Sequence, residues 1–182
     1  MEIQEKMEVA TFAGGCFWCT EAVFLELAGV SSVISGYIGG KTIDPTYKEI
    51  CGGETGHAEA IKITFDPEKI SFGELLEIFF ATHDPTTINR QGNDVGTQYR
   101  SEIFYHNEEQ KKIAEDYINL MTSEDTFGKR IVTKISAASK FYEAEDYHQN
   151  YYNDNKSQGY CSYIITPKIE KLKKVYNDKL KK

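Results

Sequence analysis

Apolar positions along the chain fall into short runs of changing period, and glycine-containing or polar breaks separate these runs. Strand-like spacing of β-branched and aromatic residues predicts strands at residues 9–13, 30–38, 57–65, 99–105 and 131–137. The first of these ends at Gly14 and Gly15. Two longer breaks, at residues 41–56 and 83–96, predict irregular connections.

Helical spacing of the apolar residues predicts helices between and after these strands. One covers residues 17–27, and two others begin at a capping-box pattern, in which Ser or Asn is followed three residues later by Glu or Gln. These patterns begin at Ser71 and Asn107, and the helix that follows Asn107 runs to Met121. A lysine-rich stretch with an apolar stripe, residues 168–182, is typical of a solvated amphipathic helix.

The order of these elements indicates the fold class. Strands and helices interleave, which predicts an α/β or α+β domain of two layers, a sheet with helices packed on it. The 182 residues favour a single domain that covers residues 1–182, and the 40% of apolar residues are enough for one sizeable core. The order of the strands in the sheet does not follow from the pattern.

Charge and composition exclude several classes of function. The formal charge is −7 and no long basic block is present, so the cationic surface that a nucleic acid requires is missing. No apolar run approaches the roughly 18 residues of a membrane helix, and residues 1–12 lack the apolar core of an export signal. We therefore expect a cytoplasmic monomer without a membrane or nucleic-acid partner, whose four cysteines are mainly reduced thiols.

Cys16 carries the strongest chemical expectation. It follows a predicted strand and a glycine pair, and it stands where the helix at residues 17–27 begins. The free backbone N–H groups at a helix start favour a thiolate, so we expect the pKa of this thiol to be lowered. Phe17 and Trp18 follow directly, which indicates an apolar slot for part of a substrate. The alternative is a buried cysteine with two core aromatics, and the glycine pair and a second cysteine nearby disfavour it.

Cys19 completes a C-x-x-C motif with Cys16. Positions three apart lie on the same face of a helix, so a disulfide between the two thiols is conceivable. A structural zinc site needs two further ligands, but the sequence has no second C-x-x-C and no H-x-x-x-H pair. We therefore expect no metal, and we interpret Cys51 as a packed, non-catalytic thiol.

Glu59 is the second candidate for chemistry. In the predicted strand it shares a face with Ile61, Ile63 and Phe65. Burial on that face would raise the pKa of the carboxyl and make it a candidate general acid. A side chain that escapes to solvent, or one that pairs with an arginine, fits the pattern equally well.

Four further polar residues can be explained one at a time by packing or turn formation. Tyr47, in an irregular segment, and Tyr99, at a predicted strand start, can offer hydroxyls to a polar substrate atom. Asp94 and His148 have no distinctive pattern of their own, and a loop aspartate is usually a turn former.

Taken in order, these residues resemble the A-type peptide methionine sulfoxide reductases. The matching motifs run from about Thr11 to Cys161 and are Gly14-Gly15-Cys16-Phe17-Trp18, Pro45-Thr46-Tyr47, Gly56-His57-Ala58-Glu59, Gln91-Gly92-Asn93-Asp94, Gly96-Thr97-Gln98-Tyr99-Arg100 and Gly159-Tyr160-Cys161. The resemblance implies an α/β (α+β) two-layer sandwich with a ferredoxin-like core and a long irregular C-terminal segment. This fold agrees with the elements predicted above.

The resemblance implies catalytic roles for five of the residues. Cys16 matches the nucleophile that attacks the sulfoxide sulfur, and Glu59 matches the acid that protonates the sulfoxide oxygen. Tyr47 and Tyr99 match hydroxyls that bind this oxygen, and Asp94 matches a residue of the same polar pocket.

The resemblance also implies a substrate and a reductant. Phe17 and Trp18 match the pocket that receives the methyl group, and His148 lies in a segment near the site. The implied reaction reduces methionine S-sulfoxide, free or in oxidised proteins, to methionine. It requires no metal or bound cofactor, and thioredoxin is the implied external dithiol partner.

Two cysteines are candidates for the resolving thiol. The reaction leaves Cys16 as a sulfenic acid, which condenses with a second thiol to form a disulfide. Cys161 matches the recycling cysteine of the family and is favoured, because a helix restricts Cys19 and a disulfide needs Cα atoms about 4.4–6.8 Å apart. The family often has glycine at position 19, and Cys19 stays an alternative resolver or a relay.

Two other functions compete with this interpretation. A general thiol–disulfide oxidoreductase that uses Cys16 and Cys19 would need neither Glu59 nor the tyrosines. A zinc-binding interaction module would contain stoichiometric zinc and would unfold on chelation.

Overall fold

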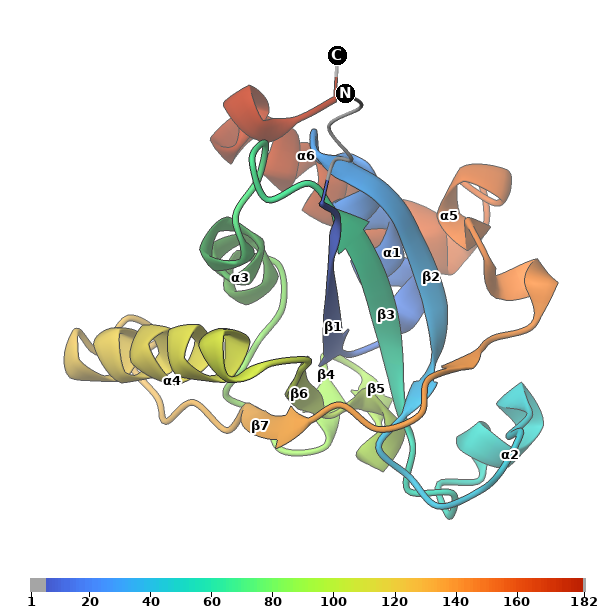
Figure 1. The fold of residues 1–182 in the computed structure, drawn as a ribbon. Coiled ribbons are helices and arrows are strands. Elements are labelled where there is room, and N and C mark those ends of the chain that lie inside the picture. Colours follow the sequence, from blue (N-terminus) through green and yellow to red (C-terminus); the bar gives the residue numbers. More distant parts are fainter. Residues whose placement is uncertain (1–5, 182) are drawn as a thin grey trace, which may run out of the picture.

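A mixed sheet forms the centre of the structure, a computed structural model that describes residues 6–181 (Figure 1). Its strands are β1 (Glu8–Gly14), β2 (Val30–Ile38), β3 (Ala58–Phe65), β6 (Ser101–Tyr105), β7 (Lys134–Ala137) and β8 (Tyr142–Glu143). Their order across the sheet is β7-β6-β1-β3-β2-β8, and every neighbouring pair is antiparallel except β6 and β7. A separate hairpin, β4 (Arg90–Gln91) with β5 (Asp94–Val95), precedes β6.

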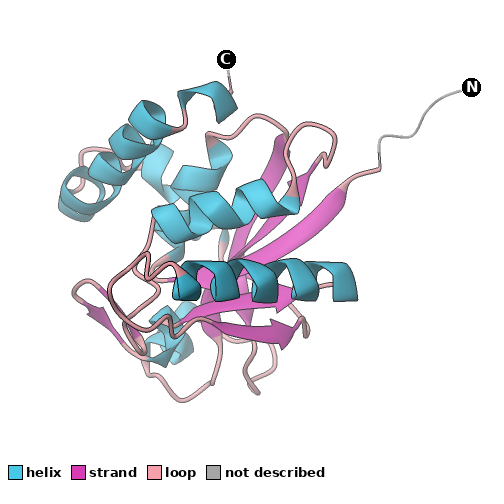
Figure 2. Cartoon of the chain, turned by 90° about the vertical axis from the view of Figure 1, so that its left-hand side faces the viewer, coloured by secondary structure: helices cyan, strands magenta, loops and turns pink. Residues whose placement is uncertain are grey.

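The helices are α1 (Phe17–Leu25), α2 (Tyr47–Cys51), α3 (Phe72–Ala81), α4 (Glu108–Ser123), α5 (Tyr151–Asp154) and α6 (Thr166–Val175). Of these, α1, α3 and α4 pack on strands of the sheet, whereas α5 and α6 pack on α1. The α1 helix contacts β2 and β3, whereas α3 contacts β1 and α4. Figure 2 shows α3 and α4 lying in front of the strands, so the molecule has a helical layer and a sheet layer.

The unit β1-α1-β2-β3-α3-β6 has the βαββαβ order of a ferredoxin-like fold. Its four strands lie in the sheet as β6-β1-β3-β2, which is the strand order of that fold. The expected α/β (α+β) fold class is therefore confirmed.

The strand β3 is central and buried on both faces. One face of β3 carries Ile61 and Ile63 into the main core beneath the helices. Its other face places Ala58 and Ala60 in a smaller apolar cluster with Phe104. In the register of β2 and β3, Glu59 lies opposite Tyr37, so this carboxyl belongs to the middle of the sheet.

Several elements begin or end at other residues than predicted. Local hydrogen bonds set these ends, and apolar periodicity does not detect such bonds. The first helix ends at Leu25 rather than at residue 27. Tyr99 belongs to a 3₁₀ turn, Thr97–Tyr99, and the strand begins only at Ser101. The strand predicted at 131–137 is shorter in the structure, where it begins only at Lys134.

Both segments predicted as irregular contain short elements. Residues 41–56 include α2, which begins at a capping box formed by Thr46 and Glu49, and residues 83–96 include the β4–β5 hairpin. At Asn107 the predicted cap is present, but the Gln110 side chain accepts from His106 rather than from Asn107.

Residues 124–160 form the long, largely irregular segment that the resemblance implies, whereas the residues after them are mostly helical. A π-helical turn, Cys161–Ile165, leads into α6, and a 3₁₀ turn, Asn177–Lys179, follows α6. The helix predicted at 168–182 therefore begins earlier, at Thr166, and ends earlier, at Val175.

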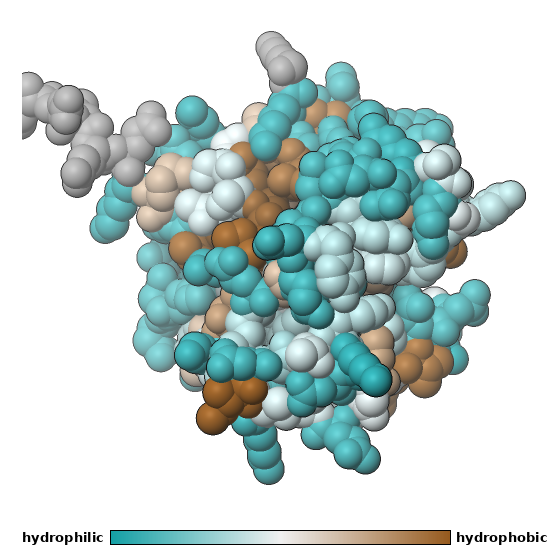
Figure 3. Space-filling model, turned by 90° about the vertical axis from the view of Figure 1, so that its right-hand side faces the viewer, coloured by the Kyte–Doolittle hydropathy of each residue, from teal (hydrophilic) through white to brown (hydrophobic). Residues whose placement is uncertain are grey.

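The side of the molecule that carries α2 and α5 has a mainly polar surface (Figure 3). On that side, Figure 3 shows apolar residues in separate small patches. Within residues 6–181, no helix combines the length and the apolar character that crossing a membrane requires.

Candidate active site

Cys16 lies at the junction of β1 and α1, where the sequence predicts it. Gly15 has a φ of +96°, and a Cβ there would lie 2.7 Å from Cγ of Gln91, so this turn requires glycine. Cys16 itself is the N-cap residue of α1 and is 9% exposed. The nucleophile candidate therefore sits at a helix start but is almost covered by its neighbours.

Glu59 reaches the start of the same helix from β3. Its side chain is buried, and Oε1 accepts a hydrogen bond of 3.2 Å from the backbone N–H of Phe17. Its second oxygen, Oε2, has no hydrogen-bond partner. Burial raises the pKa of Glu59 to about 8, and the charges of Asp94 and Cys19 act in the same direction. The carboxyl neither escapes to solvent nor pairs with an arginine, and it holds a proton at neutral pH.

The two thiols of the C-x-x-C motif interact directly. Burial raises the pKa of Cys16 well above its usual value, and the hydrogen bond with Cys19 and the charge of Glu59 raise it further. The expected lowering of this pKa is therefore wrong for the reduced protein, because the backbone N–H of Trp18 acts in the expected direction but is outweighed. The same hydrogen bond lowers the pKa of Cys19 to about 7. Cys16 thus keeps its proton and Cys19 is the more acidic thiol.

Two half-buried tyrosines lie beside Glu59. Tyr47 is the first residue of α2, and its backbone N–H donates to Oε2 of Glu145 at 3.0 Å. Burial raises the pKa of Tyr47 and of Tyr99, and the charge of Glu59 raises both further. The two predicted hydroxyls are therefore within electrostatic range of the predicted acid.

Cys51 differs from the expectation. It is the last residue of α2 and is exposed, so the interpretation as a packed thiol is wrong. The helix α2 is only five residues long and turns this side chain outward, where it hydrogen-bonds with Tyr47.

Asp94 belongs to the β4–β5 hairpin and has a partner that the sequence did not single out. The hydroxyl of Tyr160 donates to Oδ2 of Asp94 at 2.8 Å and lies 3.5 Å from Sγ of Cys19. Tyr160 also meets the ring of Trp18 edge-on, with centroids 6.0 Å apart. Tyr160 lies in the Gly-Tyr-Cys motif, but its sequence position gives no sign of these contacts, because Asp94 and Trp18 lie far away along the chain.

The aromatic slot is built around Trp18. Its indole stacks on Tyr151, with centroids 3.8 Å apart and an interplanar angle of 9°, and its Nε1–H donates to Nδ1 of His148 at 3.0 Å. Phe17 is fully buried and packs on Tyr37 and His148 at centroid distances of 5.6 and 5.2 Å. His148 therefore lies beside both aromatics, where the sequence placed it only by resemblance.

The protonation of His148 follows from its hydrogen bond. Nδ1 accepts from Trp18, so in the neutral ring Nε2 carries the hydrogen, and Nε2 has no partner in the structure. Burial lowers the pKa of His148 and favours this neutral ring. A buried N–H donor is therefore free next to the ring of Tyr47, whose centroid lies 4.3 Å away.

A buried polar network holds the segment that carries His148 and Tyr151. Gln149 bonds both backbone groups of Ser35 on β2, at 2.9 Å each. The Ser35 hydroxyl donates to Glu21 of α1, a buried carboxyl whose pKa desolvation raises to about 7. These supporting residues have no sequence signal, because the contacts of Gln149 with Ser35 span 114 residues and the bond between Ser35 and Glu21 joins a strand to a helix 14 residues away.

Cys161 is free and fully buried at the start of its π-helical turn. Burial raises the pKa of Cys161, and the charge of Cys19 raises it further. All four cysteines are free thiols. In the part of the chain that the structure describes, no three His, Cys, Asp or Glu side chains gather as a metal ion would require.

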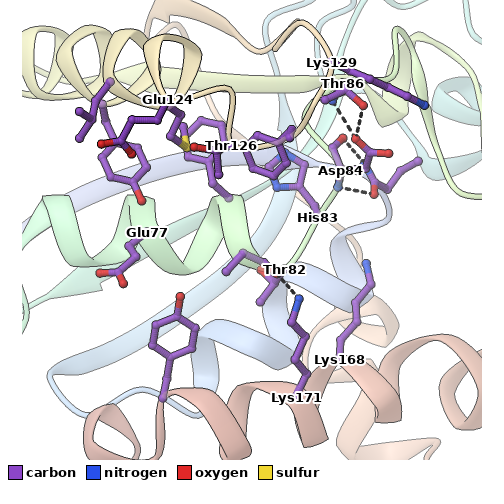
Figure 4. Close-up of a pocket in the computed structure, with 18 residues that line it drawn as sticks. Glu77, Thr82, His83, Asp84, Thr86, Glu124, Thr126, Lys129, Lys168 and Lys171 are labelled. Carbon is purple, nitrogen blue, oxygen red and sulfur yellow. Dashed lines mark hydrogen bonds between the residues drawn. The ribbon is translucent and has the colours of Figure 1, made fainter.

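A cavity of about 770 Å³ lies elsewhere, between α3, α4 and α6 (Figure 4). Asp84, Lys168 and Lys171 are among the side chains that line it, together with Gln91 of the Gln-Gly-Asn-Asp motif, but none of the candidate catalytic or substrate-binding residues does. The candidate active site is therefore separate from this cavity.

A thiol beside a carboxyl that still holds its proton suits the removal of oxygen from a substrate, because the oxygen must be protonated as it leaves. Simple disulfide exchange would not need such an acid. Fold and site thus define a cysteine-dependent reductase. The sequence model described as peptide methionine sulfoxide reductase matches residues 8–180, and the chain belongs to this family. The resemblance drawn from the motifs is confirmed.

Relatives and solved structures agree with this assignment. The chain is 59% identical over 174 residues to the peptide methionine sulfoxide reductase MsrA of Deinococcus radiodurans, which covers 96% of this chain and 84% of that protein. It is 60% identical over 173 residues to the enzyme of the same name from Sulfolobus acidocaldarius, with 95% and 97% covered.

Two solved structures of one yeast protein are similar in fold. Reduced Mxr1 from Saccharomyces cerevisiae has a TM-score of 0.74 and 37% identity, and the match covers 88% of this chain and 91% of that chain. Mxr1 in complex with Trx2 has a TM-score of 0.51 and 25% identity, with 83% and 88% covered.

Proposed function

We propose that this protein reduces methionine S-sulfoxide, free or in oxidised proteins, to methionine and thereby repairs oxidative damage. The observation that supports the proposal is the hydrogen bond from the backbone N–H of Phe17 to the Glu59 side chain, which holds a protonated carboxyl beside Cys16. Family membership and the curated relatives, which bear the name of this activity, support the reaction.

The chemistry follows from the nature of a sulfoxide. Its sulfur becomes electrophilic when its oxygen is protonated, and Glu59 is the proton donor. Sγ of Cys16 attacks the sulfur, methionine leaves, and the oxygen stays on Cys16 as a sulfenic acid. The substrate sulfur gains two electrons and Cys16 loses two, so no bound cofactor is required. The hydroxyls of Tyr47 and Tyr99 donate to the oxygen while the S–O bond breaks.

Cys16 must lose its proton before it attacks, because the thiolate is the nucleophile. Cys19 is its hydrogen-bonded partner and has a pKa near neutrality, so we assign Cys19 as the group that accepts this proton. The same contact supports a second role, in which Cys19 forms the first disulfide with Cys16.

The aromatic slot selects the substrate. A sulfoxide has a small methyl group next to its polar oxygen, and the rings of Phe17 and Trp18 provide an apolar surface for it. The free Nε2–H of His148 is a further donor at the edge of this slot. Asp94 completes the polar side of the pocket.

Recovery of the thiol needs a second cysteine and an external dithiol. Cys161 can condense directly with the Cys16 sulfenic acid, which forms a disulfide and releases water. If Cys19 has already condensed with it, Cys161 instead attacks the Cys16–Cys19 disulfide at Cys16, which forms the Cys16–Cys161 bond and frees the Cys19 thiol. Thioredoxin then exchanges its dithiol for this disulfide. A thioredoxin complex of the similar yeast protein Mxr1 supports this partner. We further propose that the protein works as a monomer in the cytoplasm.

A turnover assay with the separated sulfoxide epimers tests the function. The reduced protein, with excess dithiothreitol, should convert the S epimer of methionine sulfoxide to methionine and leave the R epimer unchanged. Cys16→Ser should abolish the reaction, whereas the exposed Cys51→Ser should retain it. Reduction of insulin disulfides without any sulfoxide turnover would instead support the general thiol–disulfide oxidoreductase.

A further inference from the structure

Cys161 cannot react with an external dithiol in the position that it occupies. Its exposure is 0%, and it begins a helical turn that continues into α6. Its backbone N–H donates to the Gln158 side chain at 3.2 Å, and its carbonyl accepts from the Thr166 hydroxyl at 3.1 Å. Sulfur exchange requires access, so the turn must open at some stage of the cycle.

Tyr160, the residue directly before Cys161, is anchored on the far side of the active site. Its hydroxyl donates to Asp94 at 2.8 Å, on a hairpin 66 residues away in sequence, and touches Cys19. The edge of its ring rests on Trp18. The Tyr160 side chain therefore ties the turn to two different elements of the site, β5 and α1.

We propose that Tyr160 is a positioning residue that keeps Cys161 buried while the site is reduced, and that loss of its hydrogen bond to Asp94 opens the turn. This inference rests on the proposed function, because it needs Cys161 to carry the oxidation out of the site.

The segment around Cys161 is built to move while its surroundings stay in place. A π-helical turn is a rare, local departure from the α-helix that is frequent at functional sites. Gly159, just before Tyr160, has open space around it. By contrast, α6 is held to the end of α3 by Lys171, whose ammonium donates to the carbonyl of Ala81 at 3.2 Å (Figure 4). Opening is therefore confined to the turn.

Oxidation of Cys16 can weaken the hydrogen bond between Tyr160 and Asp94 by competition for the Asp94 carboxylate. Tyr160 has a single hydroxyl hydrogen, so it bonds fully to one acceptor at a time, and the shorter contact is with Asp94. Tyr160 lies within one helical turn of Cys16, because its hydroxyl contacts Cys19, whose backbone N–H donates to the carbonyl of Cys16 at 3.0 Å. A sulfenic acid on Cys16 brings a new O–H donor that competes for the Asp94 carboxylate. Reaction at Cys16 thereby releases Tyr160.

Thiol labelling of the reduced protein tests the proposal without any turnover. Iodoacetamide labelling, followed by peptide mass mapping, gives the rate at Cys161 separately from those of the other cysteines. Tyr160→Phe removes only the hydroxyl, and a hydrogen bond to a charged group is strong enough that its loss should speed labelling of Cys161 by about 10-fold. Tyr163→Phe, on an exposed ring in the same turn, is the matched control and should label like the wild type.

The remaining outcomes are decisive. Equal labelling of Cys161 in Tyr160→Phe and the wild type would overturn the proposal, and so would faster labelling of all buried cysteines together with a lower melting temperature. If Tyr160→Phe does not fold, Asp94→Ala removes the same bond from the other side and must give the same labelling result. Failure of the wild type to form methionine would contradict the proposed function and not the positioning role of Tyr160.

Discussion

The backbone N–H of Phe17 donates to Oε1 of Glu59 at 3.2 Å, so the acid on the central strand caps the helix that begins at the nucleophile. A carboxyl at a helix start is ordinarily stabilised as an anion. Here burial outweighs this effect, and the pKa of Glu59 stays raised to about 8. The same contact therefore fixes the position of the acid and leaves it its proton.

Glu59→Gln should reduce the turnover of methionine sulfoxide by about 100-fold or more, which is what loss of a general acid costs. The amide can still accept from Phe17, so the helix start should be intact and the far-ultraviolet circular dichroism unchanged. In the wild type, activity should fall as pH rises through about 8, where Glu59 loses its proton. Retention of wild-type turnover in Glu59→Gln would remove Glu59 from this role.

The same substitution should change the pH dependence of stability. The folded pKa of Glu59, about 8, lies above the value of 4.5 expected for an unfolded chain, so between these pH values the folded state binds more protons than the unfolded state. The free energy of unfolding therefore falls as pH rises through this window. Glu59→Gln should raise the melting temperature at pH 8.5 and have little effect at pH 4. Glu21 titrates near pH 7 in both proteins, so the difference isolates Glu59.

The sequence was most informative where a signal is local. The capping box at Ser71 correctly predicted the start of α3, and period-two alternation correctly placed Glu59 on a buried strand face. Tyr99 was assigned to a strand, because its neighbours are strand-like. The backbone instead turns at Gly96, whose φ is +148°, and Tyr99 falls in the 3₁₀ turn that follows.

Properties that depend on distant contacts were missed or were wrong. The helix start suggested a low pKa for Cys16, but burial and Cys19 reverse the sign. Tyr151 and Tyr160 could not be distinguished among 12 tyrosines, since their partners, Trp18 and Asp94, lie far away in sequence. Local patterns thus indicate candidate reacting groups but not the residues that orient them.

Tyr151→Leu should raise KM for methionine sulfoxide by about 3- to 10-fold and change kcat little, because an aromatic pair contributes about 0.5–1.5 kcal/mol beyond its buried area. Tyr151 backs the indole of Trp18 and touches no reacting atom in the proposed pathway. Trp18 is the only tryptophan, so its emission spectrum should shift in the same variant. Tyr163→Leu is the control, since that ring is exposed and should leave both readings unchanged.

Ser71→Ala should lower the free energy of unfolding by about 1 kcal/mol, the usual contribution of an N-cap side chain. The Ser71 hydroxyl accepts from the backbone N–H of Glu74 at 3.1 Å, and the Glu74 carboxylate accepts from the Ser71 N–H in return. Urea unfolding monitored by circular dichroism measures the change. Ser71→Asp, which can also cap, should retain most of the stability, whereas equal losses in both variants would contradict the capping argument.

The disulfide formed in a single turnover should identify the resolving thiol. Stoichiometric methionine sulfoxide, added without reductant and followed by mass mapping, should give a bond between Cys16 and Cys161 in the wild type. Cys161→Ser should still release one methionine per protein but should not turn over with thioredoxin, because no accessible disulfide forms. Cys19→Ser should slow the first turnover, since Cys16 loses its proton acceptor, and should leave thioredoxin recycling in place. A bond between Cys16 and Cys19, with recycling that persists in Cys161→Ser, would assign resolution to Cys19 instead.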